Sequence, residues 1–162
     1  MKREFSLRKI QTGDNEPVAK LIRQVMTEFG AVGEGYSIMD PEVDQMYQAY
    51  NNTRSAFFVI EKEGTIYGCG GFGPLPDANE NICELKKMYF LPDLRGLGFG
   101  RKLVEQIFES AQAIGYKQVY LETVERMSQA NHLYQKMGFK KLSCSVGNTG
   151  HGSCEAYYIK DL

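Results

Sequence analysis

The sequence predicts an α/β fold, and three observations support this prediction. Two long segments, residues 15–29 and 101–114, carry apolar residues at the spacing of a helix with one buried face. Several shorter stretches alternate, or are rich in β-branched and aromatic residues, as strands are. The expected order is strand, two helices, three strands, helix, strand, helix and two strands. This mixed order indicates one sheet whose strands are joined by hairpins and a few crossovers.

The first expected elements are a short strand and a helix. Residues 5–10 roughly alternate between apolar and polar side chains, which indicates the strand. Asp14 or Asn15 can cap the helix that follows. Pro17 fits the first turn of this helix, and Gly30 can end it. The expected buried face consists of Leu21, Ile22, Val25, Met26 and Phe29.

A second helix and a hairpin are expected next. A glycine-rich loop, residues 30–39, leads to Asp40-Pro41, a pair typical of a helix start. One face of this helix would carry Val43, Met46, Tyr47 and Tyr50. Residues 56–61 and 65–71 are strand-like, and Lys62-Glu63-Gly64 offers a tight turn between them.

The second half of the chain is expected to alternate strands and helices. The expected strands are residues 82–91, 119–123, 139–144 and 155–159, and the expected helices are 98–114 and 128–137. Gly115 and Gly138 end the two helices, because glycine readily takes the left-handed conformation found there.

Length and composition indicate an ordinary globular protein. We expect one domain over residues 1–162, with 43% hydrophobic and 24% charged residues. The net charge of −1 provides no basic field for nucleic acid or an anionic membrane. No apolar run approaches the ~20 residues that cross a bilayer. Residues 1–5 are charged with no apolar stretch behind them, so no signal peptide is predicted and the expected location is cytoplasmic.

The four cysteines are expected to be free thiols. Cys69, Cys83, Cys144 and Cys154 show no paired spacing that would indicate a disulfide framework. Cys144 and Cys154, together with His151, could supply three zinc ligands, but their spacing matches no common zinc site. No metal site is predicted.

The glycine run that follows the strand at 82–91 is the most informative motif. Gly96, Gly98 and Gly100 stand at alternate positions between a predicted strand and a predicted helix. The bare backbone amides of such a turn can converge on one point, and the helix adds its positive dipole end. Arg95 offers a charge-assisted donor. This arrangement suits an anionic diphosphate, and the alternative is a sharp turn without a ligand.

Two other phosphate-binding motifs fit poorly. A Walker A loop needs Gly-Lys-Ser/Thr at its end, whereas Gly100 is followed by Arg101-Lys102-Leu103. A dinucleotide fingerprint has the spacing Gly-x-Gly-x-x-Gly, which differs from the alternating glycines here.

The glycine run resembles the coenzyme A loop of the GNAT superfamily of acyl-CoA N-acyltransferases. That loop reads Arg/Gln-x-x-Gly-x-Gly/Ala, and residues 95–100 match every fixed position. Leu91-Pro92 is similar to the end of the family's fourth strand. A second matching segment comprises Leu121-Glu122-Thr123 and Ala130-x-x-Leu133-Tyr134-x-x-x-Gly138-Phe139. The close resemblance covers residues 82–142.

The resemblance implies a fold and a reaction. The fold is a mixed, mostly antiparallel sheet of six to seven strands with about four helices, in which strands four and five splay apart at the cofactor cleft. The reaction moves an acetyl group from acetyl-CoA directly to a primary amine of a small molecule or peptide, without a metal. A homodimer is possible, and neither nucleic acid nor a membrane is expected as a partner.

The resemblance also implies which residues contact the coenzyme. Backbone groups at Met88, Tyr89 and Phe90 would bind the pantetheine arm and the carbonyl oxygen. The expected diphosphate loop is Arg95, Gly96, Leu97, Gly98, Phe99, Gly100 and Arg101. Many family members carry a coenzyme-contacting asparagine where this chain has Met127. Asn131 is expected to replace it, with Ser128 as the alternative.

Two residues are the candidate catalytic groups. Tyr134 matches the tyrosine that protonates the departing thiolate in the family, and a phenol of pKa about 10 suits a thiol of about 8.5. The alternative for Tyr134 is a tyrosine that only packs against the core. Glu84 is placed on the same strand face as Met88 and is expected to take the amine proton. The alternatives are a solvated Glu84 paired with Lys86, and Glu122 as the base.

The sequence gives less information on the residues that would bind the acceptor amine. Residues 28–44 contain Glu28, Glu34, Asp40, Glu42 and Asp44 and no lysine or arginine. Such a segment can attract a cationic amine or can be a solvated acidic loop. His151, in a glycine-rich stretch, can steer the amine or lie in solvent. The alternative function is an acyl-CoA-binding sensor without turnover, although a sensor needs neither a Tyr134 nor a Glu84.

Overall fold

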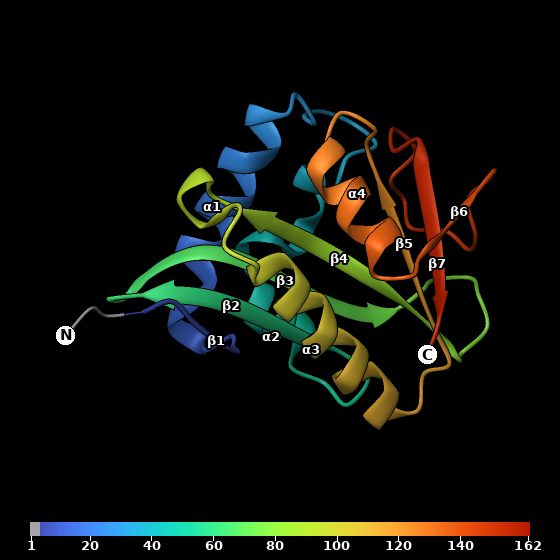
Figure 1. Ribbon diagram of the computed structural model, residues 1–162, viewed down its shortest axis with the longest axis horizontal. Coiled ribbons are helices and arrows are strands. Elements are labelled where there is room, and N and C mark those ends of the chain that lie inside the picture. The colour runs from blue at the N-terminus through green and yellow to red at the C-terminus, as the bar shows by residue number, and fades with distance from the viewer. Residues whose placement is uncertain (1–3) are drawn as a thin grey trace.

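A computed structural model describes residues 4–162, which form a seven-stranded sheet with four α-helices (Figure 1). The strands are β1 (Ser6–Lys9), β2 (Ala56–Lys62), β3 (Thr65–Pro74), β4 (Ile82–Phe90), β5 (Gln118–Thr123), β6 (Lys140–Leu142) and β7 (Ala156–Asp161). The helices are α1 (Asn15–Glu28), α2 (Met46–Tyr50), α3 (Phe99–Ile114) and α4 (Ser128–Lys136). The first three residues of the charged amino terminus lie outside the described residues.

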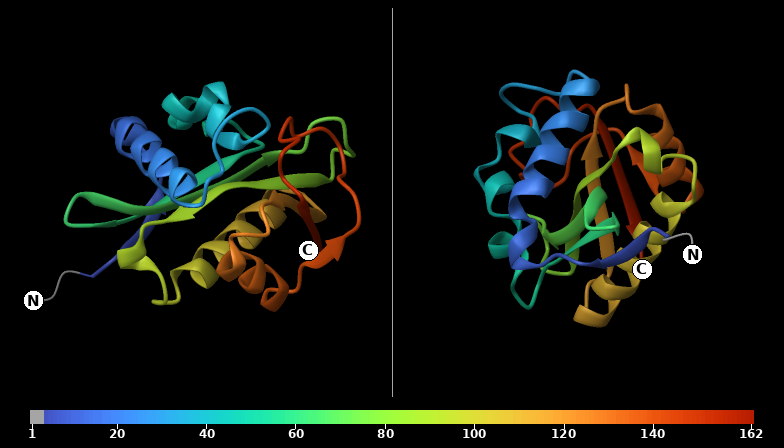
Figure 2. Two further views of the ribbon diagram at one scale, coloured as in Figure 1. Left: turned by 90° about the horizontal axis from the view of Figure 1, so that it is seen from above. Right: turned by 90° about the vertical axis from the view of Figure 1, so that its left-hand side faces the viewer.

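The sheet is mixed and mostly antiparallel, as the sequence and the family resemblance predicted. Its strand order is β1-β2-β3-β4-β5-β7-β6, and the one parallel pair in residues 4–162 is β4 with β5. Helices α1 and α2 cover one face of the sheet, and α3 and α4 cover the other (Figure 2). The protein therefore has three layers, with the sheet in the middle.

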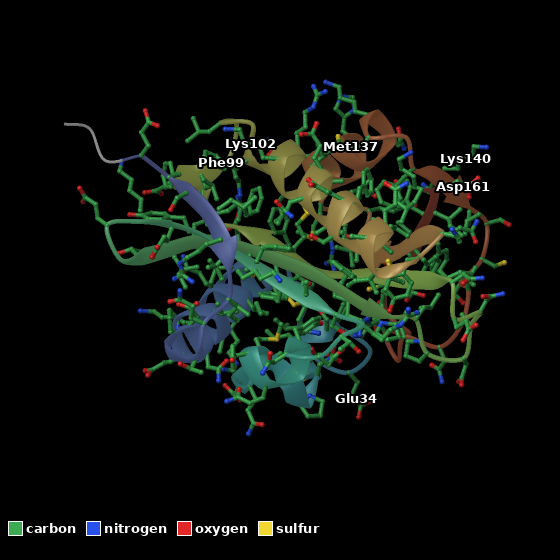
Figure 3. All side chains as sticks on the ribbon, turned by 90° about the horizontal axis from the view of Figure 1, so that it is seen from below. Glu34, Phe99, Lys102, Met137, Lys140 and Asp161 are labelled. Carbon is green, nitrogen blue, oxygen red and sulfur yellow. The ribbon has the colours of Figure 1, made fainter. Side chains whose placement is uncertain are left out.

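A hydrophobic core lies on each side of the sheet. The α1 side chains Val18, Leu21, Ile22 and Val25 pack into one core, and the α3 side chains Leu103, Val104, Ile107 and Ala111 pack into the other. Side chains fill the space between the sheet and the helices on both faces (Figure 3). The four cysteines are unpaired, as expected, with Cys69 in the first core and Cys83 in the second. No described helix is both long and apolar enough to cross a membrane.

The segment before β2 differs from the single helix that the sequence predicted from Asp40. Residues Pro41–Asp44 form a 3₁₀ turn, and α2 starts only at Met46, because Gln45 between them has φ −138° and is not helical. Three of the residues predicted for the apolar face of this segment, Val43, Met46 and Tyr50, are nevertheless buried. The side chain of Asp40 bonds Lys87 and His151, far along the chain, instead of capping a helix.

A β-bulge in β4 decides which side chains reach which face. Gly70 of β3 lies opposite two residues of β4, Lys87 and Met88, and Lys87 has φ +52°. Beyond the bulge the alternation is reversed, so Met88 packs into the core beneath α3 whereas Glu84 faces the α1 side. The expectation that Glu84 and Met88 share a face was therefore wrong.

Strands β4 and β5 separate after a short common stretch. Among the described residues they pair only between Ile82–Glu84 and Gln118–Tyr120. From there β4 stays with β3 and β5 stays with β7, and the two strands diverge (Figure 1). The predicted splay is thus present, and it leaves the outer half of β4 without a strand partner on its β5 side.

Candidate active site

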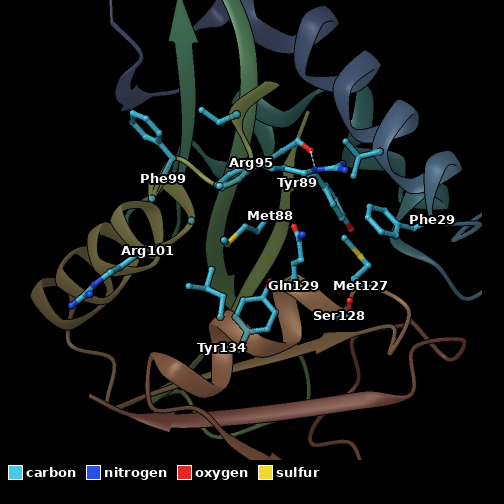
Figure 4. Close-up of a pocket in the computed structure, with 18 of the residues that line it drawn as sticks. Phe29, Met88, Tyr89, Arg95, Phe99, Arg101, Met127, Ser128, Gln129 and Tyr134 are labelled. Atoms are coloured by element: carbon cyan, nitrogen blue, oxygen red, sulfur yellow. Dashed lines mark hydrogen bonds between the residues drawn. The ribbon is translucent and has the colours of Figure 1, made fainter. Parts of the chain in front are cut away.

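The larger cavity lies where β4 and β5 separate. Its volume is about 560 Å³, and its walls come from the end of α1, the end of β4, the glycine loop, the start of α3 and α4 (Figure 4). The cavity joins the glycine loop to Tyr134, the two motifs that the sequence singled out. Met88, Tyr89 and Phe90 of β4 line it, as expected for a coenzyme arm that runs along this strand.

The glycine loop presents free backbone amides to this cavity. Gly96 and Gly98 have φ of +78° and +83°, a left-handed conformation that glycine takes without strain. The amide of Lys102 donates to the Gly98 carbonyl (3.3 Å), so the amides of residues 99–101 precede the hydrogen-bond ladder of α3. Together with the helix dipole, these amides make the start of α3 a place where an anion can bind.

Most of the predicted loop residues line the cavity, and one does not. Arg95, Gly96, Gly98, Phe99, Gly100 and Arg101 are wall residues. Leu97 is 54% exposed and lies outside the wall. Arg101 bonds Glu105 one turn along α3 (3.0 Å). Gly100 allows α3 to approach α4, because a Cβ there would lie 2.8 Å from Leu133 Cδ2.

Arg95 has a different set of partners from the one the sequence suggested. Its guanidinium donates to both carboxylate oxygens of Glu28 (2.7 and 2.9 Å) and to the carbonyl of Phe90 (3.0 Å). The hydrogen bond from Arg95 lowers the pKa of Glu28 below its usual range. The guanidinium also lies 5.3 Å above the ring of Phe29. In this structure the guanidinium of Arg95 links the glycine loop to α1. Its N–H groups bond Glu28 and Phe90 and are not all available to a ligand in the cavity.

We expect Gly98→Val to weaken acetyl-CoA binding far more than it weakens folding. Valine at φ +83° is strained, so the turn must change shape and its amides must leave their common direction. Gly64→Val is the matched control, because Gly64 has φ +80° in the β2–β3 turn and, like Gly98, no described atom within 4 Å of an added Cβ. Both variants should lose on the order of 1–2 kcal/mol of stability.

Calorimetric titration with acetyl-CoA distinguishes the two variants. Only Gly98→Val should lose affinity, by at least about tenfold. Wild-type affinity in a destabilised Gly98→Val variant would show that the loop is a structural turn only.

Tyr134 lies in the second turn of α4 with its ring against the core. It is 4% exposed, lines the larger cavity, and packs against Phe139 and Tyr158 at centroid distances of 5.7 and 6.0 Å. Burial raises the pKa of Tyr134 above its ordinary value. The phenol is therefore protonated near neutral pH and holds a proton that it can donate.

The structure places Asn131 away from the cavity. Its Nδ2 donates to the carbonyls of Val124 (3.0 Å) and Met127 (2.8 Å), and its Oδ1 accepts from the Tyr158 hydroxyl (2.8 Å). These bonds fix the entry to α4, and Asn131 is not among the wall residues. Met127 and Ser128 do line the cavity, so Ser128, the alternative to Asn131, is a polar residue at this wall.

A second, smaller cavity lies on the α1 side of β4. Its volume is about 40 Å³, and Tyr89 and Met127 are wall residues of both cavities. Its polar wall residues include Glu84, Glu122 and His151. Tyr89 and Met127 therefore form a common wall between the two cavities, with titratable side chains on one side and the glycine loop on the other.

Glu84 is a buried carboxyl with an unused oxygen. It is 2% exposed, and its Oε1 has no hydrogen-bond partner in residues 4–162. Lys86 Nζ lies 3.6 Å from Oε1, and His151 Nδ1 lies 3.9 Å from Oε2. Burial raises the pKa of Glu84 to about 7, although the charge of Lys86 opposes this rise. Near neutral pH such a group can both accept and release a proton.

The other carboxylate in this cavity is held by hydrogen bonds. Glu122 accepts from the hydroxyls of Tyr120 (2.5 Å) and Thr149 (2.6 Å), one at each oxygen. Of the two carboxylates that the sequence offered as bases, Glu84 is the one with a vacant oxygen.

The acidic segment of residues 28–44 is largely paired with cations. Glu28 bonds Arg95, Asp44 bonds Arg23, and Asp40 and Glu42 lie 2.7 and 3.3 Å from Lys87 Nζ. The idea of an open anionic patch for a cationic amine is not supported by these pairs.

Sequence reasoning missed Lys87 as a member of the site. Lys87 is buried because the bulge turns it toward the α1 side. A lysine at an inward position of a strand next to an acidic loop is the one signal that could have suggested it. Within residues 4–162, no group of three His, Cys, Asp or Glu side chains is placed to hold a metal ion.

The anion-binding helix end, the splayed parallel pair of strands and the buried tyrosine beside them define the class of acyl-CoA N-acyltransferases. The chain belongs to the acetyltransferase (GNAT) family, because residues 20–139 match the model of that family. The enzyme is thus an acetyl-CoA-dependent acetyltransferase, and the residues that line the larger cavity fit this acyl donor.

Individual relatives agree with this assignment. The chain is 40% identical to the uncharacterized N-acetyltransferase YjgM of Escherichia coli (strain K12) over 157 residues, which cover 96% of this chain and 94% of YjgM. A GNAT acetyltransferase structure from Staphylococcus aureus Mu50 matches with a TM-score of 0.85 at 19% identity, covering 98% and 99% of the two chains.

The structure of yncA from Salmonella typhimurium, described as a complex with its cofactor acetyl-CoA, matches with a TM-score of 0.77 at 17% identity. This match covers 97% of this chain and 93% of the other. At these identities the two structures support the fold.

Proposed function

We propose that this protein is an N-acetyltransferase that moves an acetyl group from acetyl-CoA directly to a primary amine of a small molecule or peptide. The observation that carries the proposal is that two adjacent cavities share Tyr89 and Met127 as wall residues. One cavity offers an anion-binding helix end and Tyr134, and the other offers Glu84 with a pKa of about 7.

The larger cavity receives the donor. The amides at the start of α3 bind the diphosphate, and the pantetheine arm enters the space between β4 and β5. Backbone N–H groups on the open side of β4 then polarise the thioester carbonyl, because fixed dipoles stabilise the negative charge that develops on its oxygen.

The proton balance assigns a role to each catalytic residue. Glu84 takes a proton from the acceptor ammonium, and the free amine nitrogen forms a bond to the carbonyl carbon. The C–S bond breaks, the Tyr134 hydroxyl gives its proton to the leaving thiolate, and the acetylated nitrogen releases its surplus proton to water to become a neutral amide. Proton exchange with solvent restores both residues. Glu84 and Tyr134 are catalytic residues in this proposal.

Direct transfer is favoured over an acetyl-enzyme at Cys154. This cysteine lines the smaller cavity, but burial, with the nearby carboxylates, raises the pKa of Cys154 to about 12. The thiol is therefore protonated near neutral pH and is a weak nucleophile.

We expect acetyl-CoA to bind in preference to ATP and NAD. The loop spacing fits the coenzyme and neither nucleotide motif, so calorimetric titration of the three compounds tests the donor assignment. Saturable heat from acetyl-CoA with little from ATP or NAD is the expected result. Tight binding of ATP or NAD, with no heat from acetyl-CoA, would overturn the proposal.

A further inference from the structure

His151 lies between the buried Glu84 and the partly exposed Asp40. Its Nε2 is 2.8 Å from Asp40 Oδ2, and its Nδ1 is 3.9 Å from Glu84 Oε2. The second distance is longer than the ~3 Å of a hydrogen bond, and catalytic contacts of this kind often tighten when substrate binds. The side chain of Asp40 is 23% exposed, whereas those of His151 and Glu84 are 8% and 3% exposed. The three groups form a row from the interior to the surface.

The charges around Asp40 determine the tautomer of His151. Burial by itself raises the pKa of Asp40, but the hydrogen bond from His151 and the charge of Lys87 lower it more, so the net pKa is below its usual range. An ionised Asp40 only accepts hydrogen bonds, and Nε2 of His151 must then carry the proton. In the neutral imidazole the lone pair of Nδ1 therefore faces Glu84.

Backbone contacts fix the position of the imidazole. The His151 amide donates to Thr149 Oγ1 (3.1 Å), and the His151 carbonyl accepts from the amide of Cys154 (3.0 Å). Lys87 Nζ donates to the same oxygen of Asp40, Oδ2 (2.7 Å), that His151 contacts. The row is thus built from three segments that are distant in the sequence and are fixed in place by the fold.

Other charged groups also face this row. Lys86 lies beside Glu84, Glu42 shares Lys87 with Asp40, and the charge of Glu122 raises the pKa of Glu84. Glu122 uses its oxygens for Tyr120 and Thr149, and Lys86 is a cation that cannot accept a proton. His151 is therefore the neighbour of Glu84 that has a vacant proton-accepting atom facing it.

We propose that His151 is a positioning residue that relays the proton taken up by Glu84 to Asp40 and from there to solvent. The inference rests on the proposed function, in which Glu84 is the base. Glu84 releases its proton to Nδ1 of His151 while Nε2 of His151 releases its own to Asp40, which passes it to water. Proton exchange with solvent then returns His151 to its starting tautomer, and no other reactant is consumed.

The test compares two variants of His151 with a control in the same loop. His151→Gln keeps a donor toward Asp40 but cannot relay a proton, and His151→Ala opens a space that free imidazole can enter. Ser153→Ala is the control, because it removes the bond from Ser153 Oγ to the Glu34 carbonyl (2.8 Å), which anchors the same loop. Thiol release from acetyl-CoA is measured with a pool of amino acids, spermidine and a tripeptide as acceptors.

The expected result is a loss of kcat of roughly tenfold or more in both His151 variants, at unchanged KM for acetyl-CoA. Added imidazole should restore His151→Ala in proportion to its concentration, at constant pH, and should not affect Ser153→Ala. Rates are expressed as the ratio of variant to wild type, since this ratio cancels the ionisation of the acceptor. Wild-type rates in the His151 variants, or a loss in His151→Ala that imidazole does not restore, would overturn the relay.

A second readout does not need an acceptor. The chain has two histidines, and nitrogen NMR of ¹⁵N-histidine protein reports the tautomer of each ring, with His132 as the internal control. The relay requires the Nε2–H form of His151, so a dominant Nδ1–H form would contradict it. If Glu84→Gln loses activity while the His151 variants do not, only the relay fails. If wild type releases no thiol with this pool, the proposed function fails instead.

Discussion

Tyr134→Phe is expected to lower kcat by roughly 10²–10⁴, or about 3–5 kcal/mol in barrier height. The ring of Tyr134 packs against Phe139 and Tyr158, so the substitution keeps the packing and removes the hydroxyl. Affinity for acetyl-CoA should change little, because the proton transfer to sulfur is made in the transition state.

Single-turnover rates are the appropriate measurement, because slow product release can hide a slower chemical step. Tyr158→Phe is the matched control, since it removes a hydroxyl from the same aromatic cluster. That hydroxyl bonds Asn131 outside the larger cavity. The control should lose about 1 kcal/mol of stability and keep its chemical step. An unchanged chemical step in Tyr134→Phe would remove Tyr134 from the mechanism.

Glu84→Gln is expected to lower kcat/KM by roughly 10² or more near neutral pH, where an acceptor amine is protonated and needs a base. The wild-type rate should rise with pH through about 7, the pKa of Glu84, because the base must be ionised to act. The loss in Glu84→Gln should shrink at high pH, since solution then supplies free amine. A pH-independent rate ratio between variant and wild type would contradict the base role.

The same substitution is expected to change how stability depends on pH. Burial raises the pKa of Glu84 from 4.5 to about 7, so the folded state binds the proton more tightly than the unfolded state. The stabilising effect of the protonated form is present below the unfolded pKa and is lost as the pH rises to about 7, by up to about 3 kcal/mol. Glu84→Gln should flatten this dependence in denaturant titrations between about pH 5 and about pH 8.

The sequence was sufficient for the features that depend on local patterns. The coenzyme loop and Tyr134 belong to contiguous motifs, and the structure places both at one cavity. The helix faces followed from apolar spacing, as with Ile22 in α1 and Ile107 in α3, which are fully buried. These features are determined by residues within one or two turns of each other.

Features that depend on distant pairing were not predictable. The bulge at Lys87 arises from the pairing of β4 with β3 opposite Gly70, and it reversed the expected face of Glu84. Arg95 bonds Glu28, which is 67 residues away, and His151 bonds Asp40, which is 111 residues away. No local pattern specifies such partners.

The most direct test of the central claim is a mass balance for the acetyl group. The wild-type protein is incubated with acetyl-CoA and the pool of amino acids, spermidine and a tripeptide, and both free thiol and acetylated amine are measured. Direct transfer predicts one acetylated amine for each thiol released, with no acetylated protein in intact mass spectra when the pool is omitted. Saturable binding of acetyl-CoA without thiol release from any acceptor would contradict the enzyme and indicate a sensor.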